Sequence, residues 1–312
     1  MRTLITGASG FCGKHLIAYL ESLGLEIHTL GRTFASKNHH YLTDIADVSA
    51  IASIIKIVQP NYVFHLAGVA SSQDTTLFYQ VNTVYAATLL YALEITGYQD
   101  CPVMLVGTSA EYGMVSSEQL PIHEKTPAHP YSNYGISKLS QTLMGSALSK
   151  QGRPLVMVRP FNIIGCGMPE YLSIQSFVKQ INKIIQGQQP PLLKVGNLSS
   201  SRDFIDVKEV VKIYWQLIQM PSAYGQVINI CSGQGTVMED MLLKLVELSK
   251  VDVEIQTESG RFKTVDVPVH YGSVEKLQSL IGYSPATNLD SILTSILAVT
   301  TEKRNEKNLN CY

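Results

Sequence analysis

The chain has 312 residues, 45% of them hydrophobic, and its 24 Lys and Arg nearly balance its 25 Asp and Glu. This length suffices for one large α/β domain or two smaller lobes. The balanced charge argues against nucleic acid, a membrane surface or a polyacidic partner, so a small-molecule ligand is expected.

The cysteines and the hydrophobic stretches predict a cellular location. The five cysteines are far apart and form no Cys-x-x-Cys pair, which indicates thiols in a reducing compartment. No His or Cys cluster has metal-ligand spacing, so no metal is expected. No run is apolar and long enough for a signal peptide or a transmembrane helix. We therefore expect a cytoplasmic protein without membrane insertion.

Apolar runs of strand length alternate with segments of helical periodicity. We expect strands at 2–6, 26–30, 62–67, 103–108, 155–160 and 227–231, and helices at 13–23, 47–58, 77–97 and 134–150. Regular β-α alternation predicts the α/β class, with a Rossmann-type doubly wound parallel sheet. The chemistry of such a sheet belongs at the carboxyl ends of its strands.

The first strand ends in a glycine-rich loop, "TGASGFCG", in which Gly7, Gly10 and Gly13 are spaced G-x-x-G-x-x-G. Glycine permits a tight turn at Gly7, close approach of backbone N–H groups to a pyrophosphate at Gly10, and close packing of helix on strand at Gly13. The position between an apolar strand and a helix predicts a dinucleotide site.

The end of the second strand bears on the choice of cofactor. Gly31 and Arg32 stand where an NAD site offers an acidic residue to the ribose. A guanidinium can pair with a 2′-phosphate, so NADPH is favoured, with NADH possible; the alternative is a solvated surface Arg32. Asp44, in "TDIAD" before the helix expected at 47–58, is suited either to the adenine amino group or to a helix N-cap.

A tyrosine and a lysine lie four residues apart in "YSNYGISK". On a helix Tyr134 and Lys138 share one face, whereas Tyr131 does not share it. Two hydroxyl residues, Thr108 and Ser109, end the strand "VMLV" about 25 residues earlier. These groups are candidates for chemistry at the same edge of the sheet.

The glycine loop, "HLAG" at 65–68 and Y-x-x-x-K together resemble the extended short-chain dehydrogenases/reductases, most of which act on nucleotide sugars. The resemblance implies that Tyr134 is the acid/base, that Thr108 hydrogen-bonds the reacting carbonyl oxygen, and that Lys138 holds the nicotinamide ribose while its charge lowers the pKa of Tyr134. It also assigns four further cofactor contacts, Phe11, Ile45, Leu66 and Ala67.

One departure from the family pattern concerns dehydration. Family members that dehydrate the sugar place an acidic pair directly after the catalytic hydroxyl, whereas this chain has Ser109 and Ala110 there. Alanine transfers no proton, which disfavours dehydration, although Glu111 follows directly. Ser109, Ala110 and Glu111 are expected beside the substrate, and ketone reduction needs only hydride, Tyr134 and Thr108.

The later segments resemble a narrower group. "RPFNIIG", "KVGNLSSSRDF", "DVKEVVKIYW" and "VINICSG" are similar to GDP-4-keto-6-deoxy-D-mannose reductases, which form GDP-D-rhamnose for cell-surface polysaccharides. That resemblance implies substrate contacts by Asn162, Lys179 and Arg202, the last at the diphosphate. The loop "FNIIGCGMPEYLS" departs from "FNHIGPGQ" of those enzymes. A GDP-4-keto-6-deoxy-heptose, or the opposite C4 stereochemistry, therefore stays open as an alternative.

The resemblance further implies two lobes and a dimer. The NADP-binding domain is expected at 1–165 with 201–232, and a smaller C-terminal sugar-nucleotide lobe at 166–200 and 233–312. Helices 77–97 and 134–150 carry apolar faces that pair across a homodimer in this superfamily, although core packing explains an apolar face equally well. Further alternatives are a nucleotide-sugar 4-epimerase, which retains NAD, and a non-catalytic dinucleotide sensor.

Several other polar residues are given structural roles. Asn82 matches a family asparagine with a structural or proton-relay role, and Cys166 suits small-residue packing. His65 is expected to make a local hydrogen bond at a strand end. Three histidines without partner spacing are expected on the surface or in loops: His123, His129 and His270.

Overall fold

The computed structural model describes residues 1–32, 39–261 and 267–302, with side chains up to residue 298. Its centre is a seven-stranded sheet in the order β10-β6-β5-β4-β1-β2-β3, and all neighbouring strands are parallel. This confirms the predicted α/β class and doubly wound sheet. The strands are β1 (Arg2–Thr6), β2 (Glu26–Gly31), β3 (His40–Leu42), β4 (Tyr62–His65), β5 (Val103–Val106), β6 (Leu155–Pro160) and β10 (Val227–Ile230).

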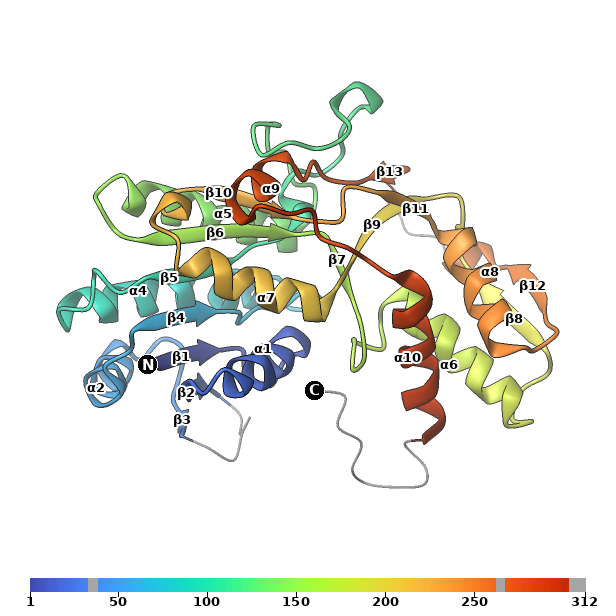
Figure 1. Ribbon diagram of the computed structural model, residues 1–312, viewed down its shortest axis with the longest axis horizontal. Helices are drawn as coiled ribbons and strands as arrows, with labels where there is room; N and C mark the ends of the chain where they lie inside the picture. Colours follow the sequence, from blue (N-terminus) through green and yellow to red (C-terminus); the bar gives the residue numbers. More distant parts are fainter. Residues whose placement is uncertain (33–38, 262–266, 303–312) are drawn as a thin grey trace.

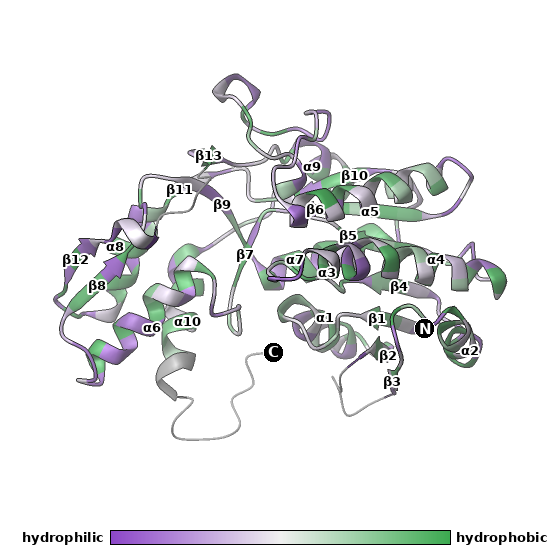
Figure 2. Ribbon diagram, turned by 180° about the vertical axis from the view of Figure 1, so that it is seen from behind, coloured by the Kyte–Doolittle hydropathy of each residue, from purple (hydrophilic) through white to green (hydrophobic). Residues whose placement is uncertain are grey.

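Helices cover both faces of this sheet (Figure 1). On one face lie α1 (Phe11–Ser22), α7 (Val207–Ile218) and α9 (Glu275–Ile281), and on the other lie α2 (Val48–Val58), α4 (Tyr85–Ile95) and α5 (Asn133–Ser149). Adjacent residues of β1 separate the two cores, because Leu4 packs in one cluster and Ile5 in the other. Figure 2 shows the hydrophobic colour both on strands of the large sheet and on the helices that cover it.

The helix expected at 77–97 is divided into three pieces. These are α3 (Thr75–Tyr79), the π-helical segment η1 (Gln80–Val84) and α4. The wider turn of η1 brings Asn82 toward the sheet, where its amide donates to Val69 O (3.0 Å) and Ser137 Oγ (2.9 Å) and accepts from Val69 N (2.8 Å). Asn82 therefore joins the loop after β4 to α5, in accordance with its expected structural role.

A smaller group of elements lies beside the large sheet (Figure 1). It has its own hydrophobic core, formed around Phe177, Leu193 and Leu242. Its members are α6 (Ser173–Ile185), β8 (Leu192–Val195), α8 (Met238–Ser249), β12 (Glu254–Thr257) and α10 (Leu289–Glu302). The separate core is the physical basis for treating these elements as a second lobe.

A small four-stranded sheet lies between the two groups. It consists of β7 (Asn162–Ile164), β9 (Ser201–Asp206), β11 (Gly235–Val237) and β13 (Val269–His270). The helix α9 falls in the range expected for the smaller lobe, yet its Leu277 packs in the core of the large sheet. The predicted domain boundaries otherwise stay a prediction, and residues 303–312 lie outside the described residues.

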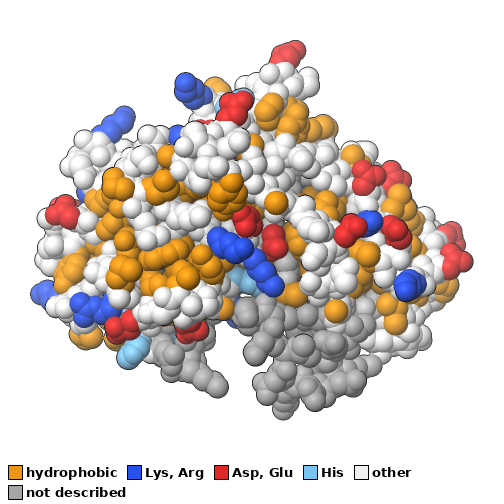
Figure 3. Space-filling model, in the orientation of Figure 1, with side chains coloured by type: hydrophobic (Ala, Val, Ile, Leu, Met, Phe, Trp, Pro, Cys, Tyr) orange, Lys and Arg blue, Asp and Glu red, His pale blue; other side chains and the backbone are white. Residues whose placement is uncertain are grey.

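Charged side chains show no large area of one sign on the face drawn in Figure 3, as far as the described residues go. Basic and acidic groups are interspersed there with hydrophobic ones.

None of the described helices is long and apolar enough to cross a membrane. The remaining short elements are the 3₁₀ turns η2 (Ser109–Glu111), η3 (Ser117–Gln119), η4 (Pro221–Ala223) and η5 (Ser259–Arg261).

Candidate active site

The turn after β1 depends on its glycines. Gly7 has φ of +74°, and a Cβ there would lie 2.6 Å from Ala67 N and from Leu66 C. A Cβ on Gly13 would overlap the carbonyl oxygen of Gly7. No side chain caps α1, which starts after Gly10, so N–H groups of its first turn remain for an anion. The loop therefore fits a pyrophosphate, and the ends of β1 and β4 meet at it.

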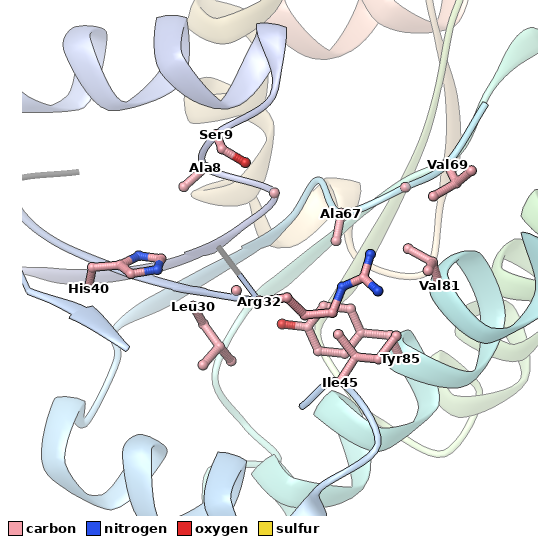
Figure 4. A pocket seen from close by; sticks show the side chains of 13 residues that line it. Ala8, Ser9, Leu30, Arg32, His40, Ile45, Ala67, Val69, Val81 and Tyr85 are labelled. Atoms are coloured by element: carbon pink, nitrogen blue, oxygen red, sulfur yellow. The ribbon is translucent and has the colours of Figure 1, made fainter. Parts of the chain in front are cut away.

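A cavity of about 340 Å³ opens beside this loop (Figure 4). Four of the expected cofactor residues line it, namely Gly7, Arg32, Ile45 and Ala67. Gly10, Phe11, Gly13, Asp44 and Leu66 do not line it. Gly31, which precedes Arg32, lines it too, and the sequence analysis missed further lining residues from five segments: Ala8, Ser9, Leu30, His40, Gly68, Val69, Val81 and Tyr85.

Asp44 does not cap a helix. Its Oδ1 accepts the N–H of Ala46 (2.9 Å), which forms a turn before α2, and the N-cap of α2 is Asp47, whose carboxylate accepts from Ala50 N. The N-cap alternative for Asp44 is therefore wrong by three residues. Two acidic residues that close to a helix start cannot be ranked from sequence alone. Ile45, the next residue, faces the cavity.

Tyr134 and Lys138 lie one turn apart on α5. Ser132 caps this helix by accepting the N–H of Gly135 (3.1 Å), which fixes where the helix begins relative to Tyr134. Lys138 is 3% exposed, and its Nζ donates to Val106 O (2.8 Å), Ala67 O (3.3 Å) and Gln141 Oε1 (3.3 Å). The lysine thus joins α5 to the ends of β4 and β5.

Burial shifts the pKa of both members of this pair. Burial raises the pKa of Tyr134 to about 12, against a lowering by its hydrogen bond with Thr108. Burial likewise lowers the pKa of Lys138 to about 8. The net shift of the Tyr134 pKa in the protein without ligand is therefore upward, because desolvation outweighs the effects that lower it, and the lowering expected from Lys138 stays a prediction. At neutral pH Tyr134 is a protonated phenol, the form that donates a proton.

Two further side chains near Tyr134 were not recognised in the sequence. Cys12 of the glycine loop and Tyr171 of the 166–172 loop both lie close enough to raise the pKa of Tyr134. Burial raises the pKa of the Cys12 thiol to about 12, so it is protonated as well. The glycine loop, α5 and the loop before α6 therefore meet at the Tyr134 phenol.

Thr108 is held by a buried ion pair. Glu111 is 0% exposed, and its carboxylate accepts from Thr108 N (3.0 Å), Thr142 Oγ1 (3.1 Å) and Arg159 Nε (2.7 Å). The expected contact of Glu111 with substrate is therefore corrected: it faces the interior and fixes the backbone of Thr108. A carboxylate bound by three donors behind the site is not available as a second acid/base.

The two expected substrate residues on the small sheet lie on adjacent strands. Asn162 begins β7, and its Nδ2 donates to Asp203 O (2.9 Å) on β9. Arg202 precedes Asp203 and donates from Nη1 to Ser201 O (2.8 Å). Asp203 is fully buried and accepts from Ser232 N (2.7 Å), among other N–H groups, so it anchors β9 to the end of β10.

The structure gives the surroundings of two other residues named in the sequence analysis. Lys179 lies on α6 in a solvent-exposed ion pair with Glu170 (2.8 Å). Among the described residues, no contact is given between Lys179 and the group around Tyr134. His270 was expected on the surface, but it is 8% exposed on β13, and its ring lies 5.3 Å from that of Phe161. The expectation for His270 is wrong because pairing with β9 buries a residue that has no sequence signal for burial.

A glycine loop on a parallel sheet and a Thr-Tyr-Lys group at the adjacent strand ends define an NAD(P)-dependent oxidoreductase-type enzyme. The comparison with known protein families supports this class of enzyme. The model of the NAD dependent epimerase/dehydratase family matches residues 3–231, and the chain belongs to this family.

Known relatives cover nearly the whole chain. It is 32% identical over 302 residues to GDP-6-deoxy-D-mannose reductase of Pseudomonas aeruginosa, covering 95% of this chain and 96% of that protein. It is 28% identical to GDP-6-deoxy-D-talose 4-dehydrogenase of Aggregatibacter actinomycetemcomitans, covering 97% and 96%. The structure of RMD from Pseudomonas aeruginosa complexed with NADPH superposes with a TM-score of 0.86 at 30% identity, covering 97% of this chain and 99% of that one.

Proposed function

We propose that this protein reduces the C4 ketone of a GDP-4-keto-6-deoxy-hexose with NADPH, giving a GDP-6-deoxy sugar such as GDP-D-rhamnose. The observation that carries the proposal is the full-length similarity to a GDP-6-deoxy-D-mannose reductase, at 32% identity, together with an intact Thr108, Tyr134 and Lys138. The NADPH complex of a similarly folded protein supports the cofactor.

In this reaction Tyr134, Thr108 and Lys138 have different roles. NADPH, when bound, supplies a hydride to the ketone carbon. Tyr134 donates its phenolic proton to the ketone oxygen, which the Thr108 hydroxyl orients by a hydrogen bond. Lys138 holds the nicotinamide ribose by exchanging one of its two longer hydrogen bonds, those at 3.3 Å to Ala67 O and Gln141 Oε1.

The buried state of Glu111 favours reduction over dehydration. Dehydration needs a second acid/base next to the catalytic hydroxyl, and Ala110 offers none. Glu111 is fully buried, and its Oε2 accepts a hydrogen bond from Arg159 Nε (2.7 Å). A protonated Tyr134 without an available carboxylate suits a single proton donation to a ketone.

Substrate recognition in this proposal uses Asn162 and Arg202 from the small sheet and Ser109 beside Thr108. Arg202 pairs with the diphosphate, for which its planar guanidinium provides parallel hydrogen bonds. Lys179 would have to leave its ion pair with Glu170 to contact the same ligand. We therefore rank Lys179 below Arg202 as a substrate contact.

A second candidate is reduction to the opposite C4 configuration. It is supported by the 28% identity to GDP-6-deoxy-D-talose 4-dehydrogenase, since 6-deoxy-D-talose is the C4 epimer of 6-deoxy-D-mannose. The binding face of the sugar decides between the two products. A 4-epimerase would retain NAD and consume no net NADPH, and a dinucleotide sensor would not need the intact Tyr134.

We further propose a cytoplasmic homodimer formed through α4 and α5. Large hydrophobic side chains are exposed on both helices, including Tyr91 (53%), Ile95 (51%) and Leu143 (61%). Pairing the same face of two copies would bury them around a two-fold axis. The cytoplasmic location is supported by the four described cysteines, which are free thiols, as is usual in a reducing compartment.

The test is NADPH oxidation with GDP-4-keto-6-deoxymannose generated in situ, followed by NMR of the product. We expect one NADPH oxidised per ketone and a large H3–H4 coupling, as in GDP-D-rhamnose. A small coupling would support the talo product instead. Absence of NADPH consumption with every GDP-4-keto sugar would refute the reductase.

A further inference from the structure

The hydroxyl of Tyr85 is buried without a hydrogen-bond partner among the described residues. Tyr85 is 2% exposed and begins α4, directly after the π-helical segment η1. Burying a hydroxyl without a partner is unfavourable, and most buried polar groups are satisfied. The catalytic group does not use this hydroxyl, and what distinguishes it from other unpartnered buried hydroxyls such as that of Tyr214 is the place of Tyr85 beside the cofactor cavity.

Tyr85 is part of the wall of the cofactor cavity. Tyr85 lines that cavity together with Leu30, Gly31 and Arg32 from the end of β2. Figure 4 shows the ring of Tyr85 beneath the side chain of Arg32, with its oxygen directed toward the β2 end and away from Val69 and Val81. In this view the guanidinium of Arg32 extends toward Ala67 and Val81, away from the hydroxyl, so Arg32 must change its rotamer before both groups can contact one ligand.

Packing fixes the direction of this hydroxyl. The ring of His65 meets the ring of Tyr85 edge to face, at 5.0 Å between centroids and 76° between planes. His65 is fully buried and is itself held at the end of β4 by a hydrogen bond with Thr6 Oγ1 (2.9 Å). Tyr85 is thus a rigid group, whereas Arg32 is exposed and can change its rotamer.

We propose that Tyr85 is a second determinant of NADPH recognition, which donates its hydroxyl hydrogen to the 2′-phosphate of the cofactor beside the guanidinium of Arg32. The inference rests on the proposed use of NADPH. The end of the second strand is where a Rossmann site meets the 2′ position of the adenosine ribose. Phosphate oxygens accept hydrogen bonds strongly, and a phenol that burial keeps protonated is a donor.

The contributions of the two residues differ in kind. Arg32 supplies charge from an exposed position, so salt screens its attraction to the phosphate. Tyr85 supplies a short, directional contact whose cost of immobilisation was met on folding. A ligand without the 2′-phosphate gives the hydroxyl no strong acceptor, so Tyr85 contributes to the preference between NADPH and NADH.

The experiment compares ligand binding to the full-length wild type and Tyr85→Phe by calorimetry. The probes are 2′,5′-ADP and NADPH, with 5′-AMP and NADH as their counterparts without the 2′-phosphate. We expect Tyr85→Phe to weaken 2′,5′-ADP and NADPH about tenfold or more, and to change 5′-AMP and NADH less than about twofold. The unliganded variant should melt at the same or a higher temperature, since it loses an unsatisfied hydroxyl.

Tyr214→Phe is the matched control. Tyr214 lies on α7, on the other face of the sheet, and it too is fully buried with an unpartnered hydroxyl. We expect this variant to bind all four ligands as the wild type does. A similar loss in both variants would overturn the proposal, because it would reflect a general effect of removing a buried hydroxyl.

The remaining outcomes separate this inference from the function it rests on. Unchanged binding of 2′,5′-ADP to Tyr85→Phe, or an equal loss for NADH and NADPH, overturns the contact with the 2′-phosphate. Failure of the wild type to bind NADPH refutes the proposed cofactor itself. If the variant does not fold, a crystal structure of the wild type with 2′,5′-ADP decides: the hydroxyl must lie within about 3 Å of a phosphate oxygen.

Discussion

The catalytic group on the large sheet and the substrate residues on the smaller elements are built in different ways. Lys138 and Glu111 are almost completely buried, and each makes three hydrogen bonds to fixed partners. Lys179 on α6 has only an exposed ion pair. The difference teaches that core packing holds Lys138 and Glu111 in place, whereas the proposed substrate residues Asn162 and Arg202 are half-buried and Lys179 is exposed.

Replacing the catalytic phenol should have the largest effect. Tyr134→Phe removes the proton donor while keeping the ring, so we expect kcat for ketone reduction to fall about 10²- to 10⁴-fold. Binding of NADPH should change little, because the hydroxyl acts on the ketone oxygen. Stopped-flow measurement of NADPH oxidation checks this expectation. Full activity of Tyr134→Phe would contradict the assignment.

Breaking the buried ion pair should be the largest change in stability. Glu111→Ala leaves the guanidinium of Arg159 buried without its partner, which costs about 3–5 kcal/mol in the free energy of unfolding. The same variant frees the N–H of Thr108, so kcat should fall too. Urea unfolding gives the stability, with Glu118→Ala on the 3₁₀ turn η3 as the control. Equal stability of both variants would refute the role given to Glu111.

Replacing Arg202 on β9 should affect substrate binding more than catalysis. We expect Arg202→Ala to raise KM for the GDP sugar about tenfold or more, with a smaller change in kcat, because the diphosphate loses a charged pair of hydrogen bonds. Steady-state kinetics at saturating NADPH tests this. An unchanged KM would remove Arg202 from the substrate site.

The pH dependence follows from the shifted groups. The pKa of Lys138 is lowered to about 8 and that of Tyr134 is raised to about 12. As pH rises through about 8, Lys138 loses its charge while Tyr134 stays protonated, so kcat/KM should fall about tenfold between pH 8 and pH 9.5. The profile is measured with a buffer series of constant ionic strength. A loss that begins only near pH 10 would show that burial does not control Lys138.

The smallest effect is expected for the exposed ion pair. Lys179→Ala should change the free energy of unfolding by less than about 1 kcal/mol and leave KM for the GDP sugar within about twofold. This variant, measured beside Arg202→Ala, tests whether the exposed Lys179 contributes less to binding of the GDP sugar than the half-buried Arg202 does. A tenfold rise in KM would restore Lys179 as a substrate contact.

The fold was predictable because its signals are local. Strand-length apolar runs such as that of β5 alternate with helices, and Gly7, Gly10 and Gly13 mark the first turn, so class and sheet type followed from periodicity and spacing. The Tyr134–Lys138 pair needed only a helical spacing of four. The division of the 77–97 helix by η1 was not predictable, since it depends on where Asn82 finds Val69 and Ser137.

The missed features of the site depend on contacts distant in sequence. Glu111 is turned inward by Arg159, 48 residues away, and His270 is buried by pairing with β9. Tyr85 joins the cavity because α4 lies across from the end of β2. The one sequence signal for Tyr85 was its place one turn after Asn82, on a helix that the loop after β4 contacts.

The central claim is tested most directly by incubating the protein with NADPH and GDP-4-keto-6-deoxymannose and identifying the product by NMR. The account predicts one equivalent of NADPH oxidised per ketone and a GDP-6-deoxy-hexose with hydrogen newly bound at C4. Retention of NADPH with conversion of one GDP sugar into another would indicate epimerisation. No reaction of a folded, NADPH-binding protein with any GDP-4-keto sugar would contradict the account.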